Sequence, residues 1–315
     1  GTAGKLSKWS DTDTLTDSLV SESGTTVCVG GSLSAHAICA SDSLNNVKIG
    51  SSALQNNTTG SDNTAIGACA LLQSLSGTSN FAAGNQTLRY NTSGSYNTAI
   101  GFQALRDNNS GSHNSAIGQY ALVSNSTGCY NSATGYLALQ CNTTGSHNSA
   151  IGSNALRSNT TGAYNAAIGQ QALKNNVIGQ NNVAIGLWAL CNNNSSYNYA
   201  IGSYALRNNA TGQFNVAFGQ AALQVSTGGC NTAIGGNAGD TSTSGICSIF
   251  IGQSAIAGGA TDSNTIVIGA GANGKGSNTT TIGNSSTTDA YICGDINTNV
   301  VKSSTLPTGN ILCLE

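Results

Sequence analysis

The chain repeats one hydrophobic pattern, Asn-x-Ala-Ile-Gly-x-x-Ala-Leu, from about residue 46 to about residue 286. The glycine of this pattern recurs in steps of 17 residues from Gly50 to Gly186, then in steps of 16, 17, 16, 17, 17 and 14 residues up to Gly283. A unit of this length cannot bury its apolar side chains alone, whereas stacked units share one continuous core. The pattern therefore predicts an all-β parallel β-solenoid of about 15 coils with repeats of about 17 residues.

Each repeat is expected to contain a short strand whose successive side chains point to opposite faces. In the segment 97–101, Ala99 and Ile100 therefore face opposite ways. We call the equivalent positions of successive repeats a column, and the columns of Ala99 and Ile100 are both apolar along the chain. We expect the alanine column to lie inside the coil. The second apolar pair of each repeat, such as Ala104-Leu105, is expected to fill the other side of the same interior. The isoleucine column needs cover from elsewhere, because an exposed apolar stripe of this length would promote aggregation.

A second and a third copy of the same chain are the expected cover for the isoleucine column. Burying one isoleucine side chain contributes roughly 1.5–3 kcal/mol, so a column of them would make the oligomer practically permanent. The predicted trimer core consists of Ile66, Ile100, Ile117, Ile151, Ile168, Ile185, Ile201 and Ile234. The sequence thus predicts a homo-oligomer, with a trimer as the expected form.

The glycine and asparagine columns of the repeat are each expected to have a structural role. The repeat glycine is expected at a tight corner, where φ is positive or a side chain would clash. The asparagine column that begins at Asn46 and continues to Asn231 is expected to hydrogen-bond along the stack, like the amide ladders of cross-β assemblies. Loops such as 142–145 and 159–162 have the composition of turns.

The repeat divides the chain into three parts. Residues 1–45 lack it and are predicted to form a strand-rich N-terminal segment, with strands at 15–20 and 25–29. Residues 46–287 are predicted to form the solenoid shaft or head. Residues 288–315 are predicted to form a C-terminal neck and tail, with one more strand at 289–296.

Composition narrows the choice of partners. Only 7 % of the residues are charged and the net charge is -2, which gives no general attraction to nucleic acid or to anionic membranes. No apolar stretch of about 18 residues occurs, so no membrane insertion is expected. The ten cysteines include no Cys-x-x-Cys pair and are interpreted as small, partly buried fillers, with Cys129 and Cys141 as the first candidates for a disulfide.

Catalysis is not expected. Between residues 46 and 235 the acidic residues are Asp62 and Asp107, and no pair of carboxylates recurs. Glycan hydrolysis by a β-helical enzyme needs two carboxylates about 5–9.5 Å apart. We therefore predict no enzymatic activity, no catalytic or metal-binding residue and no cofactor.

Flat rings recur in one column two residues before the strand. This column contains Tyr96, His113, Tyr130, His147, Tyr164, Tyr197 and Phe214. We interpret it as a structural aromatic ladder. Two alternatives are a metal site in which copies of His113 meet on a trimer axis, and a stripe on which a glycan stacks.

Basic residues recur five positions after the repeat glycine, at Arg89, Arg106, Arg157, Lys174 and Arg207. Coils of a β-solenoid lie about 4.8 Å apart, so Arg89 with Arg106, and Arg157 with Lys174, could hold one anionic chain such as an acidic polysaccharide. The alternative is that these residues give solubility to an otherwise uncharged rod and bond to neighbouring loops.

The repeat resembles known fibrous proteins. Thr265-Ile266-Val267-Ile268-Gly269-Ala270-Gly271-Ala272, followed by a 14-residue step to Thr281-Ile282-Gly283-Asn284, resembles the YadA-like head of trimeric autotransporter adhesins. The longer unit at 94–106 is similar to repeats in phage or virus tail-fibre and spike shafts. The resemblance covers residues 46 to about 296 and implies a left-handed trimeric fibre.

Repeat and resemblance together predict a non-enzymatic fibre or spike protein. Its expected role is attachment to a host or surface, with a host-surface glycan as a candidate ligand, or that of a rigid spacer, outside a virus particle or a cell. One alternative is a structural filament whose subunits join end to end. A lesser alternative is an ice-binding solenoid, for which the column from Thr64 to Val183 is too mixed in composition.

Overall fold

The computed structural model describes residues 5–9, 15–23, 26–29 and 44–287. The chain splits into two compact units, Gly1–Asp42 and Ser43–Glu315. In the first unit, β1 (Lys5–Trp9), β2 (Leu15–Ser23) and β3 (Thr26–Val29) form an antiparallel sheet in that order. The strands predicted at 15–20 and 25–29 match β2 and β3 to within three residues at their ends. The strand predicted at 289–296 and the rest of the predicted C-terminal segment lie outside the described residues.

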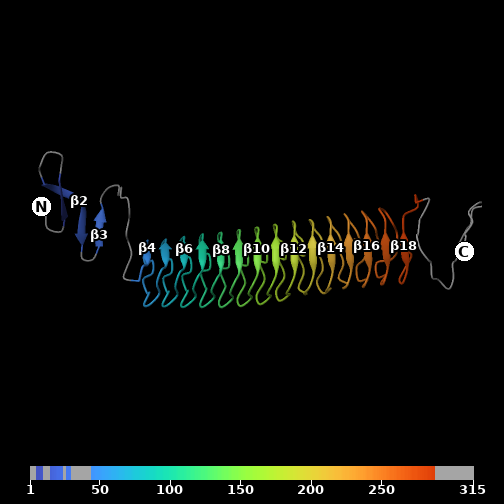
Figure 1. Cartoon of the computed structure of the whole chain (residues 1–315), viewed down its shortest axis with the longest axis horizontal. Coiled ribbons are helices and arrows are strands. Elements are labelled where there is room, and N and C mark those ends of the chain that lie inside the picture. Colours follow the sequence, from blue (N-terminus) through green and yellow to red (C-terminus); the bar gives the residue numbers. More distant parts are fainter. Residues whose placement is uncertain (1–4, 10–14, 24–25, 30–43, 288–315) are drawn as a thin grey trace, which may run out of the picture. The chain divides into compact units, whose positions relative to one another are not determined.

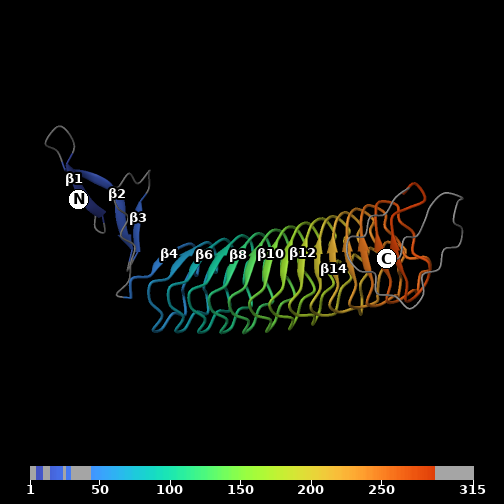
Figure 2. The ribbon, with the colours of Figure 1, turned by 45° about the vertical axis from the view of Figure 1, so that its right-hand side comes forward.

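The second unit is a parallel β-solenoid in which 15 strands of three residues form one sheet in sequence order. The strands follow one another along a single axis, so the colour changes steadily from one coil to the next (Figures 1 and 2). They are β4 (Val47–Ile49), β5 (Thr64–Ile66), β6 (Phe81–Ala83), β7 (Thr98–Ile100), β8 (Ser115–Ile117), β9 (Ser132–Thr134), β10 (Ser149–Ile151), β11 (Ala166–Ile168), β12 (Val183–Ile185), β13 (Tyr199–Ile201), β14 (Val216–Phe218), β15 (Thr232–Ile234), β16 (Ile249–Ile251), β17 (Ile266–Ile268) and β18 (Thr280–Ile282). The predicted fold class is confirmed.

The alternation of side chains within each strand follows the prediction. From β5 to β17 the middle residue is buried, as at Ala99 and Ala150, while the first and third residues point outward. Adjacent strands pair in exact register, so Ala150 lies beside Ala167 and Ile151 beside Ile168. The second apolar pair closes the coil from the other side, and Leu105 and its equivalents are fully buried.

Corner glycines end each strand, and their geometry confirms why no other residue fits. At Gly152 φ is +131°, and a Cβ atom added there would lie 2.6 Å from the carbonyl oxygen of Gly169 in the next coil. A second glycine column closes the loops: a Cβ atom on Gly128 would lie 2.3 Å from the carbonyl oxygen of Gly145. At both glycine columns, the backbones of neighbouring coils lie too close together for a side chain to fit between them.

The turn after each corner glycine is left-handed at residues that normally avoid this conformation. The buried leucine column has positive φ throughout, for example 51° at Leu105 and 50° at Leu156. An isolated residue in this region costs about 1–3 kcal/mol and persists only where its surroundings fix it. Here the N–H of Leu105 donates to the carbonyl of Ala121, 3.0 Å away in the next coil, and the equivalent bond recurs at each leucine of the column from Leu54 to Leu223. Stacking therefore stabilises a turn that local preference disfavours.

Two buried asparagine ladders run along the stack. In the predicted ladder, Oδ1 of Asn148 accepts from both the backbone N–H (3.0 Å) and the Nδ2 (3.1 Å) of Asn165 in the next coil. The second ladder lies in the loops, where Nδ2 of Asn159 donates to Oδ1 of Asn142 at 2.8 Å. The carbonyl of Gly162 accepts from Nδ2 of both Asn148 (2.8 Å) and Asn159 (2.9 Å), which joins the two ladders.

We expect Asn148→Leu to destabilise its coils by about 2–4 kcal/mol. The leucine side chain has a similar size but leaves the buried N–H of Asn165 without an acceptor, and an unpaired buried group costs about 1–3 kcal/mol. Amide hydrogen exchange should show faster opening around β10 and β11. The control is Asn175→Leu, which removes one exposed bond to Asn192 and should leave exchange nearly unchanged. Equal effects of the two substitutions would contradict the ladder.

The core is repacked near the C-terminal end of the solenoid. Gly239 occupies the position that leucine holds in the preceding coils, and Phe250 replaces the inner alanine of its strand. A Cβ atom on Gly239 would lie 2.8 Å from Cδ2 of Phe250. The missing leucine side chain therefore makes room for the phenylalanine ring, and core volume is conserved.

Candidate functional site

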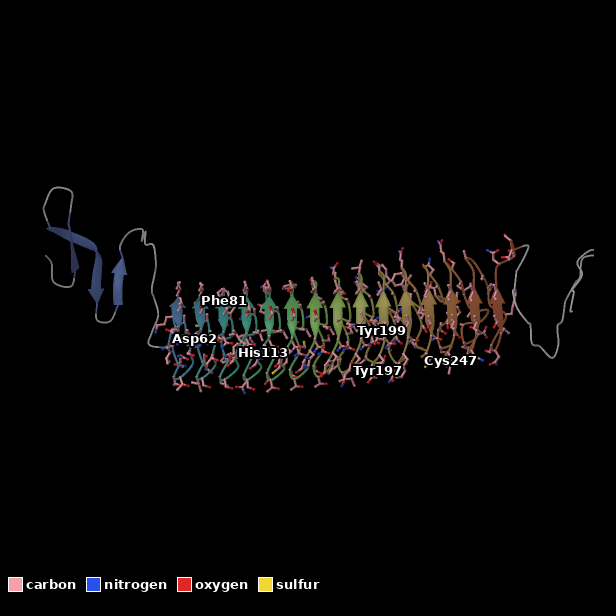
Figure 3. All side chains as sticks on the ribbon, in the orientation of Figure 1. Asp62, Phe81, His113, Tyr197, Tyr199 and Cys247 are labelled. Carbon is pink, nitrogen blue, oxygen red and sulfur yellow. The ribbon has the colours of Figure 1, made fainter. Side chains whose placement is uncertain are left out.

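The isoleucine face, which we define as the outward side chains of β4–β18, exposes a column of large apolar side chains along the solenoid. Phe81 of β6 and Tyr199 of β13 lie on it (Figure 3). The eight isoleucines predicted to form the trimer core are each 37–46 % exposed in the single chain. The sequence therefore identified correctly which column the chain's own fold leaves uncovered.

The composition of the isoleucine face changes along the solenoid. Between β5 and β10 the first outward residue is mostly polar, as at Thr98 and Ser115. Further on it is mostly apolar, at Val183, Val216 and Ile249, so that both outward columns become hydrophobic there. Fifteen strands about 4.8 Å apart and about 10 Å wide give the face an area of roughly 700 Å².

The ring column is stacked as predicted. Tyr96, His113, Tyr130, His147 and Tyr164 lie in parallel on successive coils, with ring centroids 4.8–5.0 Å apart and interplanar angles of 3–10°. Asn181 interrupts the column, and Tyr197 and Phe214 then form a second stack at 5.1 Å. Figure 3 labels His113 and Tyr197 as members of this column.

Stacking determines what this column can present to a ligand. The faces of the inner rings are covered by neighbouring rings, so the edges, with phenol and imidazole groups, point to solvent. A glycan that stacks on an aromatic face would find no free face along the inner part of the ladder. In one chain His113 and His147 are separated by Tyr130, and the described residues contain no group of three or more His, Cys, Asp or Glu arranged to hold a metal. The geometry favours the structural interpretation.

The basic column is largely engaged in contacts within the chain. Arg106 forms a two-bond pair with Asp107, at 2.7 and 2.6 Å, and its Nη1 donates to Gln103. The hydrogen bond to Asp107 raises the pKa of the Arg106 guanidinium. Nε of Arg157 donates to Gln140 at 2.8 Å, and the guanidinium of Arg89 lies 5.1 Å from the ring centre of Tyr90.

The last two members of the basic column flank a buried thiol. Arg207 stacks over Trp188 at 4.6 Å and lies 5.5 Å from the ring centre of Tyr204. Cys191 lies in the column between Lys174 and Arg207, and burial raises its pKa although the two cations oppose the shift. The pairs Arg89 with Arg106 and Arg157 with Lys174 do occupy adjacent coils, but three of these four residues have neutral or acidic neighbours as partners. This arrangement favours the solubility and loop-bonding interpretation.

The described aspartates have local structural partners or lie alone in turns. Asp62 accepts from the hydroxyl of Ser61 at 2.8 Å, and Asp262 accepts from the N–H of Gly259 at 2.6 Å. Burial raises the pKa of the Asp240 carboxyl. None of these contacts joins two carboxyl groups.

The asparagines of most Asn-x-Ser/Thr sequences belong to the second ladder. Asn91, Asn125, Asn142, Asn159 and Asn209 are fully buried. The side chains of Asn57 and Asn278 are half-buried and exposed, respectively. Burial thus removes the ladder positions as glycosylation sites in the folded chain.

We expect folded protein made in a glycosylating host to carry glycans at Asn278 and none at the ladder asparagines. A glycan on Nδ2 of Asn142 would replace its bonds to Asn125 and Gly145 and could not fit inside the coil. Glycopeptide mass spectrometry of the soluble, folded fraction gives the occupancy of each site. A glycan on Asn142 in material with full strand content would contradict the buried ladder.

The described cysteines are all free thiols: Cys69, Cys129, Cys141, Cys191, Cys230 and Cys247. Cys129 and Cys141, the first candidates for a disulfide, are not bonded to each other. Cys129 lies in the column of Ser112 and Ser146 and takes part in their ladder, accepting from the N–H of Ser112 at 3.4 Å. Cys141 lies in a different column, beyond the buried pair Ala138-Leu139, so the two thiols face different parts of the coil.

In the part of the chain that the structure describes, no helix has the length and hydropathy needed to span a membrane. Comparison of the chain with protein-family models finds no match, and comparison with curated protein sequences finds none either.

Proposed function

We propose that this chain is a non-enzymatic fibre or spike protein that assembles as a homotrimer through the isoleucine face. Its proposed role is attachment to a host or surface, or rigid spacing, on the outside of a virus particle or a cell. The observation that carries the proposal is the uncovered isoleucine column, which runs along the whole solenoid at 37–46 % exposure for the eight residues named above.

The size of the isoleucine face supports self-association. Its area of roughly 700 Å² per chain is close to the ~800 Å² that each partner buries in a stable interface. The isoleucine column is mostly apolar along this face and both outward columns are mostly apolar beyond β11, and contiguous exposed apolar surface of this kind marks interaction sites. A second copy presents the same face at the same coil spacing, so isoleucines of the two copies can interdigitate over the full length.

The number of copies rests on the resemblance to trimeric adhesin heads and fibre shafts. A face-to-face dimer would cover the same isoleucines, so a direct mass measurement distinguishes the two. We expect light scattering of the purified chain to give three times the single-chain mass of 31.4 kDa, and negative-stain images to show rods of one length. A stable monomer would overturn the proposal, and a mass of two chains would replace the trimer by a dimer.

The same measurement tests the alternative of a filament. Strands β4 and β18 each have one neighbour in the described sheet, so end-to-end joining of subunits would pair two strand edges. Rods that lengthen with protein concentration would support that alternative. An ice-binding role is disfavoured, because large rings such as Phe81 and Tyr199 interrupt the outward rows of the sheet. Binding of the trimer to glycan arrays would test attachment itself.

A further inference from the structure

Two exposed cysteines, Cys230 and Cys247, occupy the same position on adjacent coils. Each lies two residues before its strand, and β15 and β16 pair in register, with Thr232 beside Ile249. Their φ angles are nearly equal, 59° and 56°, so the two Cα–Cβ bonds point in the same direction. The N–H of Cys247 donates to the carbonyl of Gly229 at 3.1 Å, which holds the two turns side by side.

The stacked rings of the same column show how far apart side chains on adjacent coils lie. Cys230 and Cys247 continue the ring column, in which Tyr197 and Phe214 stack at 5.1 Å (Figure 3 labels Tyr197 and Cys247). The backbone spacing of about 4.8 Å between coils lies within the Cα–Cα range of about 4.4–6.8 Å for disulfides. Disulfides also need Cβ atoms about 3.5–4.5 Å apart, so the two Cβ atoms must approach by at least about 0.3 Å. Both cysteines are exposed, and Gly228 and Gly229 before Cys230 carry no side chain that would oppose this approach.

The second asparagine ladder does not reach these two coils. The second asparagine ladder ends at Asn209, and its next positions are Ser226 and Ser242, whose buried hydroxyl groups have no hydrogen-bond partner. The first ladder changes from asparagine to serine after Asn231, at Ser248. Asn231 of the first ladder still joins these coils, because its Oδ1 accepts from the N–H of Ser248 at 3.0 Å and its Nδ2 donates to the carbonyl of Gly245 at 2.8 Å. A covalent link between Cys230 and Cys247 would therefore add a bond between coils that the second ladder no longer joins.

We propose that Cys230 and Cys247 form a reversible disulfide between adjacent coils and that this pair is a modification site for small-molecule disulfides. The thiolate of one cysteine attacks a sulfur of the small disulfide, which forms a mixed disulfide and releases one small thiol. The thiolate of the second cysteine then attacks the protein sulfur of the mixed disulfide and releases the second small thiol. The protein loses two electrons and two protons, and the oxidant gains them.

The other described cysteines are not arranged in this way. Cys191 is buried, and its column neighbours are Lys174 and Arg207. Cys69, Cys129 and Cys141 lie in three different columns. In the described solenoid, Cys230 and Cys247 are thus the pair that shares a column on adjacent coils. Exposure of both thiols makes the disulfide accessible to reductants as well as to oxidants.

The test uses the full chain treated with glutathione disulfide, followed by alkylation of free thiols, unfolding and digestion with a protease that cuts before aspartate. Asp240 is the one aspartate between the two cysteines, so cleavage gives fragments 107–239 and 240–261, and the second contains only Cys247. We expect the two fragments to remain linked until a reductant is added. The link should be absent in Cys230→Ser and present in the control Cys129→Ser.

Three outcomes would overturn the proposal. In the first, Cys230 and Cys247 each end as a mixed disulfide with glutathione and no link forms. In the second, the link persists in Cys230→Ser, which would place it at another thiol. In the third, the link joins two chains and appears as a doubled mass under denaturing, non-reducing conditions.

Discussion

The double substitution Ile117→Asp with Ile151→Asp should convert the proposed trimer into single chains of 31.4 kDa. The two isoleucines lie on the isoleucine face at either side of Thr134, so the change makes three successive coils polar. In the single chain they are 41 % and 46 % exposed, so aspartates there remain hydrated and the solenoid should still fold. In an assembled interface the same carboxylates would be buried without partners, which costs several kcal/mol each.

Light scattering coupled to size exclusion gives the mass, and circular dichroism reports whether the strands persist. The matched control is Thr144→Asp with Thr161→Asp, which adds the same charge at exposed loop positions away from the strands and should leave the mass unchanged. Folded double variants that keep the wild-type mass would show that the isoleucine face is not the contact surface.

Gly152→Ala should be about twice as destabilising as Gly276→Ala. Both glycines have strongly positive φ, +131° and +118°, so both substitutions carry backbone strain of about 1–3 kcal/mol. Only at Gly152 would the new Cβ atom also meet backbone, 2.6 Å from the oxygen and 2.7 Å from the carbonyl carbon of Gly169. At Gly276 no atom lies within 4 Å. The clash should roughly double the cost, since overpacking adds about 1–3 kcal/mol.

Amide hydrogen exchange measured separately at β10–β11 and at β17–β18 reports local opening of the structure around each substitution. A local measurement is needed because a long repeat array need not unfold in one step. We expect strongly increased exchange around Gly152→Ala and a small increase around Gly276→Ala. Similar increases at both sites would mean that the left-handed backbone alone, and not the close approach of coils, requires glycine at the corner.

Much of the fold could be predicted because each residue in a stacked repeat lies next to its own equivalents. That rule placed Ala99 inside, Ile100 outside, Gly101 at the corner and Asn97 in a ladder, and the structure confirms all four positions. It also predicted the stacking of Tyr96 on His113.

Contacts between different columns could not be predicted in the same way. The repeat does not specify the cross-section of the coil, so the partners of Arg106 and Arg157 and the separation of Cys129 from Cys141 were not accessible from spacing. The second asparagine ladder was missed because its members, such as Asn142 and Asn159, lie in segments with ordinary turn composition. One signal for it was present: this asparagine recurs three residues before the loop glycine in most coils.

The sequence by itself determined the solenoid, its register and the two apolar columns. In a stack of repeats, equivalent residues of successive units become neighbours, so the period of the sequence specifies these contacts. The tertiary structure decided the left-handed turns at residues such as Leu105, which intrinsic preference opposes and which hydrogen bonds from the next coil hold in place. The tertiary structure also decided that the stacked rings present their edges to solvent, and that Cys230 and Cys247 lie on adjacent coils beyond the end of the second asparagine ladder. These features depend on how one coil meets the next in three dimensions.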